Sequence, residues 1–250
     1  MLSTADSTYT AAQENTSEWA WGRPRGLTLL TARSDAAPSE RARRALNVVV
    51  AFLALVVAMP LMLGIALLVK LTSPGPVFYR QTRVGVDRRK GTGGNWRRQV
   101  DYGGRLFTMY KFRTMTHVET PAESVNQVWA TPDDPRVTPV GRVLRKYRLD
   151  ELPQLFNVLR GEMNVVGPRP EQPRIFMSLR EQVDRYAVRQ RVLPGITGWA
   201  QINLPYDRSV DDVRQKVGLD IEYLQRASAA EDMKILARTL PVVLLRKGAW

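Results

Sequence analysis

Two adjacent carboxylates, Asp150 and Glu151, are the residues whose types and spacing point most directly to chemistry. The chain has no cysteine and a single histidine, so the roles of acid, base, nucleophile and metal ligand fall mainly to carboxylates. Arg145, Lys146 and Arg148 closely precede the pair, and nearby cations favour the charged form of a carboxylate. One carboxylate of such a pair can attack phosphorus while the other holds Mg²⁺ between phosphate oxygens.

The same two residues also fit a purely structural role. Aspartate is a common N-cap, and glutamate is common in the first turn of a helix. The sequence predicts a helix that starts around Asp150, ends at Gly161 and carries four apolar side chains on one face, at Leu152, Leu155, Phe156 and Leu159. A carboxylate engaged in capping would be a poorer nucleophile, so the structural and the catalytic interpretations compete.

Basic residues elsewhere in the chain are candidates for binding phosphate. Arg169 lies between two prolines that stiffen its backbone, and its planar guanidinium suits bidentate contact with phosphate. A surface ion pair is the structural alternative. Lys111 and Arg113 belong to the alternating segment RLFTMYKFRTM, and a period of two places them on the same face of a predicted strand.

A β-hairpin and several short helices are the elements that must position these side chains. Residues 77–83 and 105–113 are predicted to pair as strands, and the intervening basic loop 86–104 is either a solvated insertion or a patch for anionic headgroups. Thr138 is the expected cap of a short helix with Pro139 at its first position. Further helices are expected over 179–192, 210–226 and 231–245, and the last either lies in the membrane plane or packs on the domain.

The most apolar feature is the uncharged run of 25 residues at 45–69. As a straight helix it would reach about 37 Å, more than the roughly 30 Å of a bilayer core. Basic residues flank it on both sides, which fits poorly with a single span under the positive-inside rule. Pro60 inside the run favours a kink, so a helix that re-enters and returns to the same face competes with a kinked span.

Charge and composition bound the remaining possibilities. The formal net charge is +13, so anionic partners are expected. Nucleic acid is disfavoured because the basic residues are dispersed and the chain has no recognised reader motif. We expect the sequence to divide into a disordered tail at 1–40, a membrane-embedded helix at 41–72 and a folded domain at 73–250.

Four ordered motifs resemble one known family. KFRTM, LDELPQLFNVLRGEM, VGPRPE and PGITGWAQIN, preceded by the apolar run and SPGPVFYRQTRVG, are similar to the bacterial sugar transferases, the monotopic phosphoglycosyl transferases. The resemblance covers roughly residues 41–250. It implies an α+β fold in which a membrane helix, re-entrant at Pro60, precedes a small cytoplasmic domain with a β-hairpin, short helices and an amphipathic interfacial helix.

The resemblance also implies an activity. The family moves a sugar-1-phosphate from a nucleoside diphosphate sugar, often a UDP-sugar, to undecaprenyl phosphate or a similar polyprenyl phosphate, through an aspartyl-phosphosugar intermediate. By match, Asp150 is the nucleophile and Glu151 the Mg²⁺ ligand, with Asp150 able to share the metal, and Arg145 and Arg169 lie near the phosphates. Lys111 and Arg113 are further phosphate candidates.

That match places the chain at an anionic inner membrane in a bacterium, with its catalytic domain in the cytoplasm and a role in starting an exopolysaccharide or other glycoconjugate. Homo-oligomerisation stays open. The competing hypothesis is a membrane-tethered basic scaffold that recruits glycan-synthesis partners without Mg²⁺ or nucleotide release.

Overall fold

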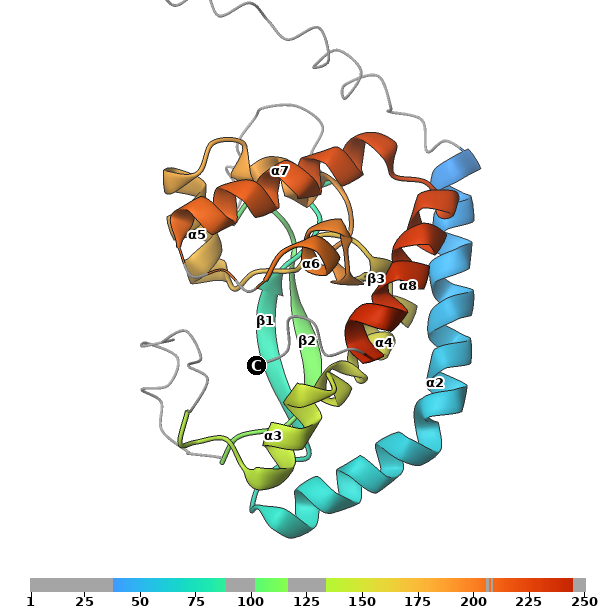
Figure 1. Cartoon of the computed structure of the whole chain (residues 1–250), viewed down its shortest axis with the longest axis vertical. Helices are drawn as coiled ribbons and strands as arrows, with labels where there is room; N and C mark the ends of the chain where they lie inside the picture. The colour runs from blue at the N-terminus through green and yellow to red at the C-terminus, as the bar shows by residue number, and fades with distance from the viewer. Residues whose placement is uncertain (1–37, 89–101, 117–133, 206, 208, 245–250) are drawn as a thin grey trace, which may run out of the picture. The chain divides into compact units, whose positions relative to one another are not determined.

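The computed structural model describes residues 38–88, 102–116, 134–205, 207 and 209–244 (Figure 1). Almost all of the predicted tail at 1–40 and most of the basic loop at 86–104 lie outside these residues. The described part is mixed α+β, with one long apolar helix, several short helices and two small sheets. This agrees with the predicted fold class at that level.

The long helix α2 (Pro38–Thr72) contains Pro60 in its interior. Figure 1 shows α2 changing direction sharply between its blue first part and its teal last part. Because proline removes a helical hydrogen bond and clashes with the preceding turn, the bend has an identified cause. One face of α2 packs on the domain through residues three, four or seven positions apart, namely Ala51, Leu55, Met62, Ile65 and Val69.

The opposite face of α2 is exposed and apolar. Its exposed side chains include Phe52, Leu53, Val56, Val57, Leu61, Leu63, Leu67, Leu68 and Leu71. A contiguous surface of this kind marks an interaction with a membrane or another partner. By length and composition, the part of α2 from Glu40 to Thr72 is apolar enough to cross a bilayer. The structure therefore supports membrane association through α2.

The first turns of α2 are attached to the domain by polar contacts. Arg43 lies 3.1 Å from Asp232 and donates a 2.6 Å hydrogen bond to the Tyr223 hydroxyl. Arg44 donates to the carbonyl oxygen of Val158 at 2.6 Å, near the end of helix α4 (Gln154–Leu159). Both arginines belong to the basic flank that precedes the apolar run, and the structure gives them partners within the protein.

The predicted hairpin is confirmed. Strand β1 (Phe78–Val84) pairs antiparallel with β2 (Leu106–Phe112), from Phe78 opposite Phe112 to Val84 opposite Leu106. Helix α4 is fastened to this hairpin by the buried amide of Asn157. Its Oδ1 accepts from the backbone N–H of Tyr110 at 3.1 Å, and its Nδ2 donates to the Thr108 carbonyl at 2.7 Å. One side chain thus acts as a strand partner for β2.

A second sheet joins β3 (Asn164–Val166) and β4 (Gly195–Thr197) in parallel. Asn47 on α2 contacts this sheet, because its Oδ1 accepts from the Val165 N–H at 2.6 Å. Its Nδ2 donates to the Arg43 carbonyl at 2.7 Å. The partners that a polar residue in an apolar helix requires are therefore supplied within the protein.

The remaining helices follow the predicted order with one break. Thr138 caps α3 (Pro139–Lys146), accepting from the Gly141 N–H at 2.9 Å, as predicted. The single helix expected over 179–192 is wrong: α5 (Pro173–Gln182) ends at an extended Val183, and the left-handed Arg185 precedes the 3-10 helix η3 (Tyr186–Arg191). The chain continues through α6 (Trp199–Asn203), α7 (Val210–Arg226) and α8 (Ala229–Leu244).

The sequence predicts that helix α8 either packs on the domain or lies on the membrane. Its Asp232 and Ile235 are completely buried, so one face packs on the domain. Met233 and Leu240 are exposed. Packing is thus confirmed for one face, and the interfacial role of the other face stays a prediction.

Candidate active site

Asp150 and Glu151 lie in a 3-10 turn, η2 (Leu149–Glu151), between α3 and α4. The expectation of a helix starting around Asp150 is wrong: α4 begins at Gln154, with Pro153 in the N-cap position. Pro153 has no N–H to continue the hydrogen-bond ladder of a helix begun at Asp150. The residue in the N-cap position of η2 is Arg148. Asp150 therefore caps neither element, and the structural interpretation of this residue does not apply.

Glu151 is buried and surrounded by cations. Lys111 Nζ and Arg169 Nη2 each lie 2.8 Å from its Oε1, and Arg148 Nη1 lies 4.0 Å from its Oε2. Burial alone would raise the pKa of Glu151, but the charges of Arg169 and Lys111 outweigh it and hold that pKa well below its usual range. Glu151 is therefore ionised at any physiological pH.

Asp150 has the opposite environment although it is the next residue. Its carboxylate is buried, and Lys111 Nζ is 4.0 Å from its Oδ2. Burial raises the pKa of Asp150, and the negative charge of Glu151 raises it further, whereas Lys111 opposes the shift. Two neighbouring carboxylates with pKa values pushed in opposite directions are typical of a divided catalytic role. The more basic of the two, Asp150, is the better nucleophile once ionised.

Of the other two predicted phosphate ligands, the structure places Arg145 near the two carboxylates but not Arg113. Arg145 donates its Nε–H to Thr114 Oγ1 at 2.9 Å, and its charge is near enough to lower the pKa of Asp150. Arg113 instead donates to the Ser73 carbonyl at 2.7 Å, at the end of α2. β2 ends at Phe112, so the alternation that would align Arg113 with Lys111 stops before it.

The backbone around Arg169 is fixed by a hydrogen bond at each residue from 168 to 171. Four consecutive carbonyl oxygens, of residues 168 to 171, each accept a hydrogen bond of 2.9 to 3.1 Å. The donors are, in order, Gly195 N, Arg189 Nη2, Arg83 Nη1 and Val84 N. Two of these residues are on β1, one is on β4 and one is on η3. The guanidinium of Arg169 is therefore presented to Glu151 from a fixed segment.

A charged cluster behind this segment was missed by sequence reasoning. Arg189, which is almost completely buried, lies 2.9 Å from Asp220 and 3.7 Å from Glu171. Lys216 lies 3.4 Å from the same Glu171 oxygen. Arg189 and Asp220 are far apart in sequence, on η3 and α7, so no local spacing could have revealed their contact.

Removing Arg189 is expected to destabilise the fold. Arg189→Ala would remove the cation that lies 2.9 Å from the buried carboxylate of Asp220, and breaking a buried pair costs roughly 3–5 kcal/mol of unfolding free energy. Urea denaturation in detergent measures the loss. Arg214→Ala is the matched control, because the pair that Arg214 makes with Asp211 is exposed and should contribute less than about 1 kcal/mol. Equal losses in the two variants would contradict the role of the buried cluster.

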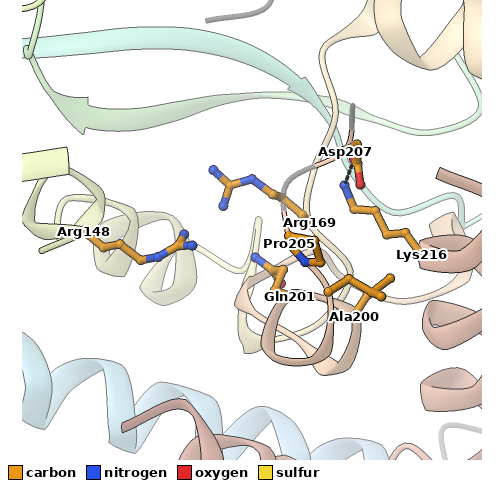
Figure 2. A pocket seen from close by; sticks show the side chains of 8 residues that line it. Arg148, Arg169, Ala200, Gln201, Pro205, Asp207 and Lys216 are labelled. Carbon is orange, nitrogen blue, oxygen red and sulfur yellow. Dashed lines mark hydrogen bonds and ion pairs between the residues drawn. The ribbon is translucent and has the colours of Figure 1, made fainter. Parts of the chain in front are cut away.

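A pocket opens beside the acidic pair. Figure 2 shows Arg148 at one end of it and the guanidinium of Arg169 pointing toward that end from the centre, where Gln201 and Pro205 lie. Ala200 and the ion pair of Asp207 and Lys216 are at the other end. From the sequence alone, Arg148 is one of three cations that closely precede Asp150. Its backbone is left-handed, with φ of 54°, and a non-glycine residue in this conformation is often found at functional sites.

Comparison with known proteins gives several relatives. The chain is 39% identical over 207 residues to UDP-N-acetylgalactosamine-undecaprenyl-phosphate N-acetylgalactosaminephosphotransferase of Aeromonas hydrophila, covering 83% of this chain and 44% of that protein. It is 40% identical over 210 residues to UDP-glucose:undecaprenyl-phosphate glucose-1-phosphate transferase of Escherichia coli (strain K12), covering 83% and 41%. The protein of the same name from Caulobacter vibrioides is also 40% identical over 210 residues, covering 83% and 72%.

The chain spans less than half the length of the first two of these relatives. The family model described as bacterial sugar transferase matches residues 38–246, which include α2, the hairpin, the acidic pair and the Arg169 segment. With a match over most of its length, the chain belongs to the bacterial sugar transferase family.

Proposed function

We propose that this chain transfers a sugar-1-phosphate from a UDP-sugar to undecaprenyl phosphate, as the first step of polysaccharide synthesis. Family membership and the names of the relatives support the reaction class. One observation of this chain carries the proposal. Two adjacent carboxylates are buried next to Lys111 and Arg169, beside a pocket. The pKa of the first, Asp150, is raised, and the pKa of the second, Glu151, is lowered.

The proposed reaction has two displacements at the same phosphorus. A carboxylate oxygen of Asp150 attacks the phosphorus that bears the sugar, the bond from that phosphorus to the bridging oxygen breaks, and UMP leaves. An oxygen of the lipid phosphate then attacks the phosphorus, its bond to Asp150 breaks, and the carboxylate is regenerated. The product is a polyprenyl diphosphosugar, and no oxidant or net proton donor is needed.

The cations around the pair oppose the main electrostatic barrier. An anionic carboxylate must approach an anionic diphosphate, and preorganised positive groups reduce that repulsion in a site shielded from water. Lys111 contacts both carboxylates, at 4.0 Å from Asp150 and 2.8 Å from Glu151. Glu151 holds Lys111 and Arg169 in place through its Oε1, which assigns it an orienting role alongside Asp150.

The two adjacent carboxylates fit a magnesium ion whose remaining ligands are substrate phosphates and water. The described residues include no cluster of three or more acidic or histidine side chains for a protein-only metal site. Mg²⁺ is usually bound through one or two carboxylates together with substrate phosphates and water. Glu151 and Asp150 would hold it. When bound, the ion would neutralise charge on the phosphate oxygens.

The proposed membrane arrangement is a re-entrant helix bent at Pro60, with both ends and the catalytic domain on the cytoplasmic face of the inner membrane. Contacts at the two ends of α2 support it. Near its start, Arg44 donates to Val158 of the domain, and just past its end the carbonyl of Ser73 accepts from Arg113 of the same domain. A helix crossing the bilayer would place these ends on opposite sides.

Cysteine labelling tests this topology. The chain lacks cysteine, so Ser39→Cys and Thr72→Cys give unique labels before and after the bend. In intact spheroplasts, we expect an impermeant maleimide to label neither position, and inverted vesicles to label both. Labelling of only one position in each preparation would show a span instead.

A nucleotide-release assay tests the function. The full-length protein in nanodiscs is given undecaprenyl phosphate and a panel of UDP-sugars, and UMP is measured with EDTA or with Mg²⁺. We expect release with at least one donor, lost in EDTA and restored by Mg²⁺. No release with any donor would favour a membrane-tethered scaffold.

A further inference from the structure

We infer that the pocket in Figure 2 forms the floor of the nucleoside diphosphate subsite, with the phosphates against Arg148 and Arg169 and the nucleoside lying over α6 toward Asp207. This inference rests on the proposed transfer reaction for the class of ligand. It adds three residues to the site, namely Arg148, Gln201 and Asp207, which the sequence analysis did not assign to a ligand. The two ends of the pocket differ in chemistry, and each suits a different part of the ligand.

The end nearest the acidic pair suits a diphosphate. The guanidinium groups of Arg148 and Arg169 approach different oxygens of Glu151, at 4.0 and 2.8 Å, and both residues line the pocket. Planar guanidinium groups bind phosphate oxygens in pairs. A diphosphate held here would have its sugar-bearing phosphorus beside Asp150, the residue next to Glu151.

The unusual backbone conformation of Arg148 is a second feature of this end of the pocket. The left-handed conformation of Arg148 is followed directly by the turn that contains both carboxylates. Such a conformation costs of the order of 1 kcal/mol for a residue with a Cβ, and strain of this kind concentrates at ligand-binding sites. The arginine therefore faces the pocket at a cost that a structural turn could avoid with glycine or asparagine.

The middle and far end of the pocket suit a nucleoside. Ala200, Leu204 and Pro205 give an apolar wall for a flat base, and Gln201 lies in the same wall. Beyond them, Asp207 is fixed by a 2.6 Å contact with Lys216. A carboxylate can accept hydrogen bonds from ribose hydroxyls, as it does in dinucleotide-binding Rossmann folds.

The lipid substrate fits this pocket poorly. An isoprenoid chain entering it would have to desolvate the Asp207–Lys216 ion pair without giving it new partners, which is unfavourable. The exposed apolar face of α2 offers that chain a surface continuous with the bilayer instead. The acceptor phosphate is therefore expected to reach Asp150 from the side of α2, away from the nucleoside.

Equilibrium binding to the full-length protein tests the two ends of the pocket separately, with UMP, UDP, a UDP-sugar and inorganic pyrophosphate as probes. Arg148→Asn keeps a residue that tolerates the left-handed backbone and should weaken UDP and pyrophosphate at least tenfold. Asp207→Asn should weaken UMP and UDP about tenfold and leave pyrophosphate within twofold. Arg142→Asn, which removes the same charge from the exposed surface of α3, should change none of them.

Each other outcome has a defined meaning. Unchanged UDP affinity in both Arg148→Asn and Asp207→Asn would overturn the subsite. Loss of UDP-sugar affinity in Asp207→Asn, with UMP affinity unchanged, would overturn the nucleoside assignment and place the sugar there. UDP binding that depends on both residues, in a protein that never releases UMP, would refute the proposed transfer but leave the subsite standing.

Discussion

Replacing Asp150 with asparagine is expected to abolish sugar-phosphate transfer, with a loss on the order of 10³-fold or more. The amide keeps the shape of the carboxylate but has no anionic oxygen to bond to phosphorus. UMP release and formation of the lipid-linked product measure the effect. The exposed substitution Asp211→Asn on α7 is the matched control and should retain full activity.

The same variant is expected to be more stable than the wild type. Since the pKa of Asp150 is raised above its usual 3.8 in the folded protein, ionising it disfavours folding. The stability advantage of Asp150→Asn should therefore grow as pH rises from 3.8 through the raised pKa and stay constant above it. Wild-type activity should fall on the acid side at a higher pH than an ordinary aspartate would give. A variant that lost activity and stability together at neutral pH would indicate misfolding rather than removal of a nucleophile.

Replacing Glu151 with glutamine is the second prediction with a large effect. The change leaves Lys111 and Arg169 without the anion that holds both at 2.8 Å. We expect transfer to fall roughly 10²-fold, a loss typical of one removed electrostatic group, and the Mg²⁺ concentration for half-maximal activity to rise. The free energy of unfolding should fall by about 2–3 kcal/mol. This is at or below the roughly 3–5 kcal/mol that is lost when a fully buried ion pair is broken, because Arg169 keeps partial access to solvent.

The pH dependence of that loss has the opposite sign to that of Asp150. Because the pKa of Glu151 is held well below its usual 4.5, its ionised form stabilises the folded protein at every pH above 4.5. The penalty of Glu151→Gln should therefore be full at neutral pH and shrink as pH falls below 4.5. A penalty that stayed constant from pH 7 down to the acid limit of folding would contradict the assigned cation cluster. Glu222→Gln, a half-exposed glutamate, serves as the control.

Elements with strong local patterns could be predicted from the sequence. The hairpin follows from period-two alternation with aromatic residues, and α7 has the predicted bounds, with a capping box of Ser209 and Asp212 at its start. The break between α5 and η3 could not be seen, because it depends on a left-handed Arg185 rather than on glycine or proline. The side-chain amides of Asn47 and Asn157 that bond to strands were also not visible, since each acts on a segment distant in sequence.

The candidate site shows the same division. Motif spacing singled out Asp150, Glu151, Lys111 and Arg169, and the structure brings these four together. Motif spacing could not show that Arg113 turns to Ser73 instead, because this depends on where β2 ends. It also could not find the contact of Arg189 with the Arg169 carbonyl, which requires the fold to place η3 behind that segment.

Trapping the covalent intermediate tests the central claim most directly. The full-length protein is mixed with a UDP-sugar and Mg²⁺ in the absence of polyprenyl phosphate, quenched within seconds and digested for mass spectrometry. A nucleophilic Asp150 predicts a burst of about one UMP per protein molecule and a phosphosugar mass on the peptide that contains this residue, both absent in Asp150→Asn. UMP release only when the lipid phosphate is present, with no modified peptide, would contradict the account and indicate direct transfer.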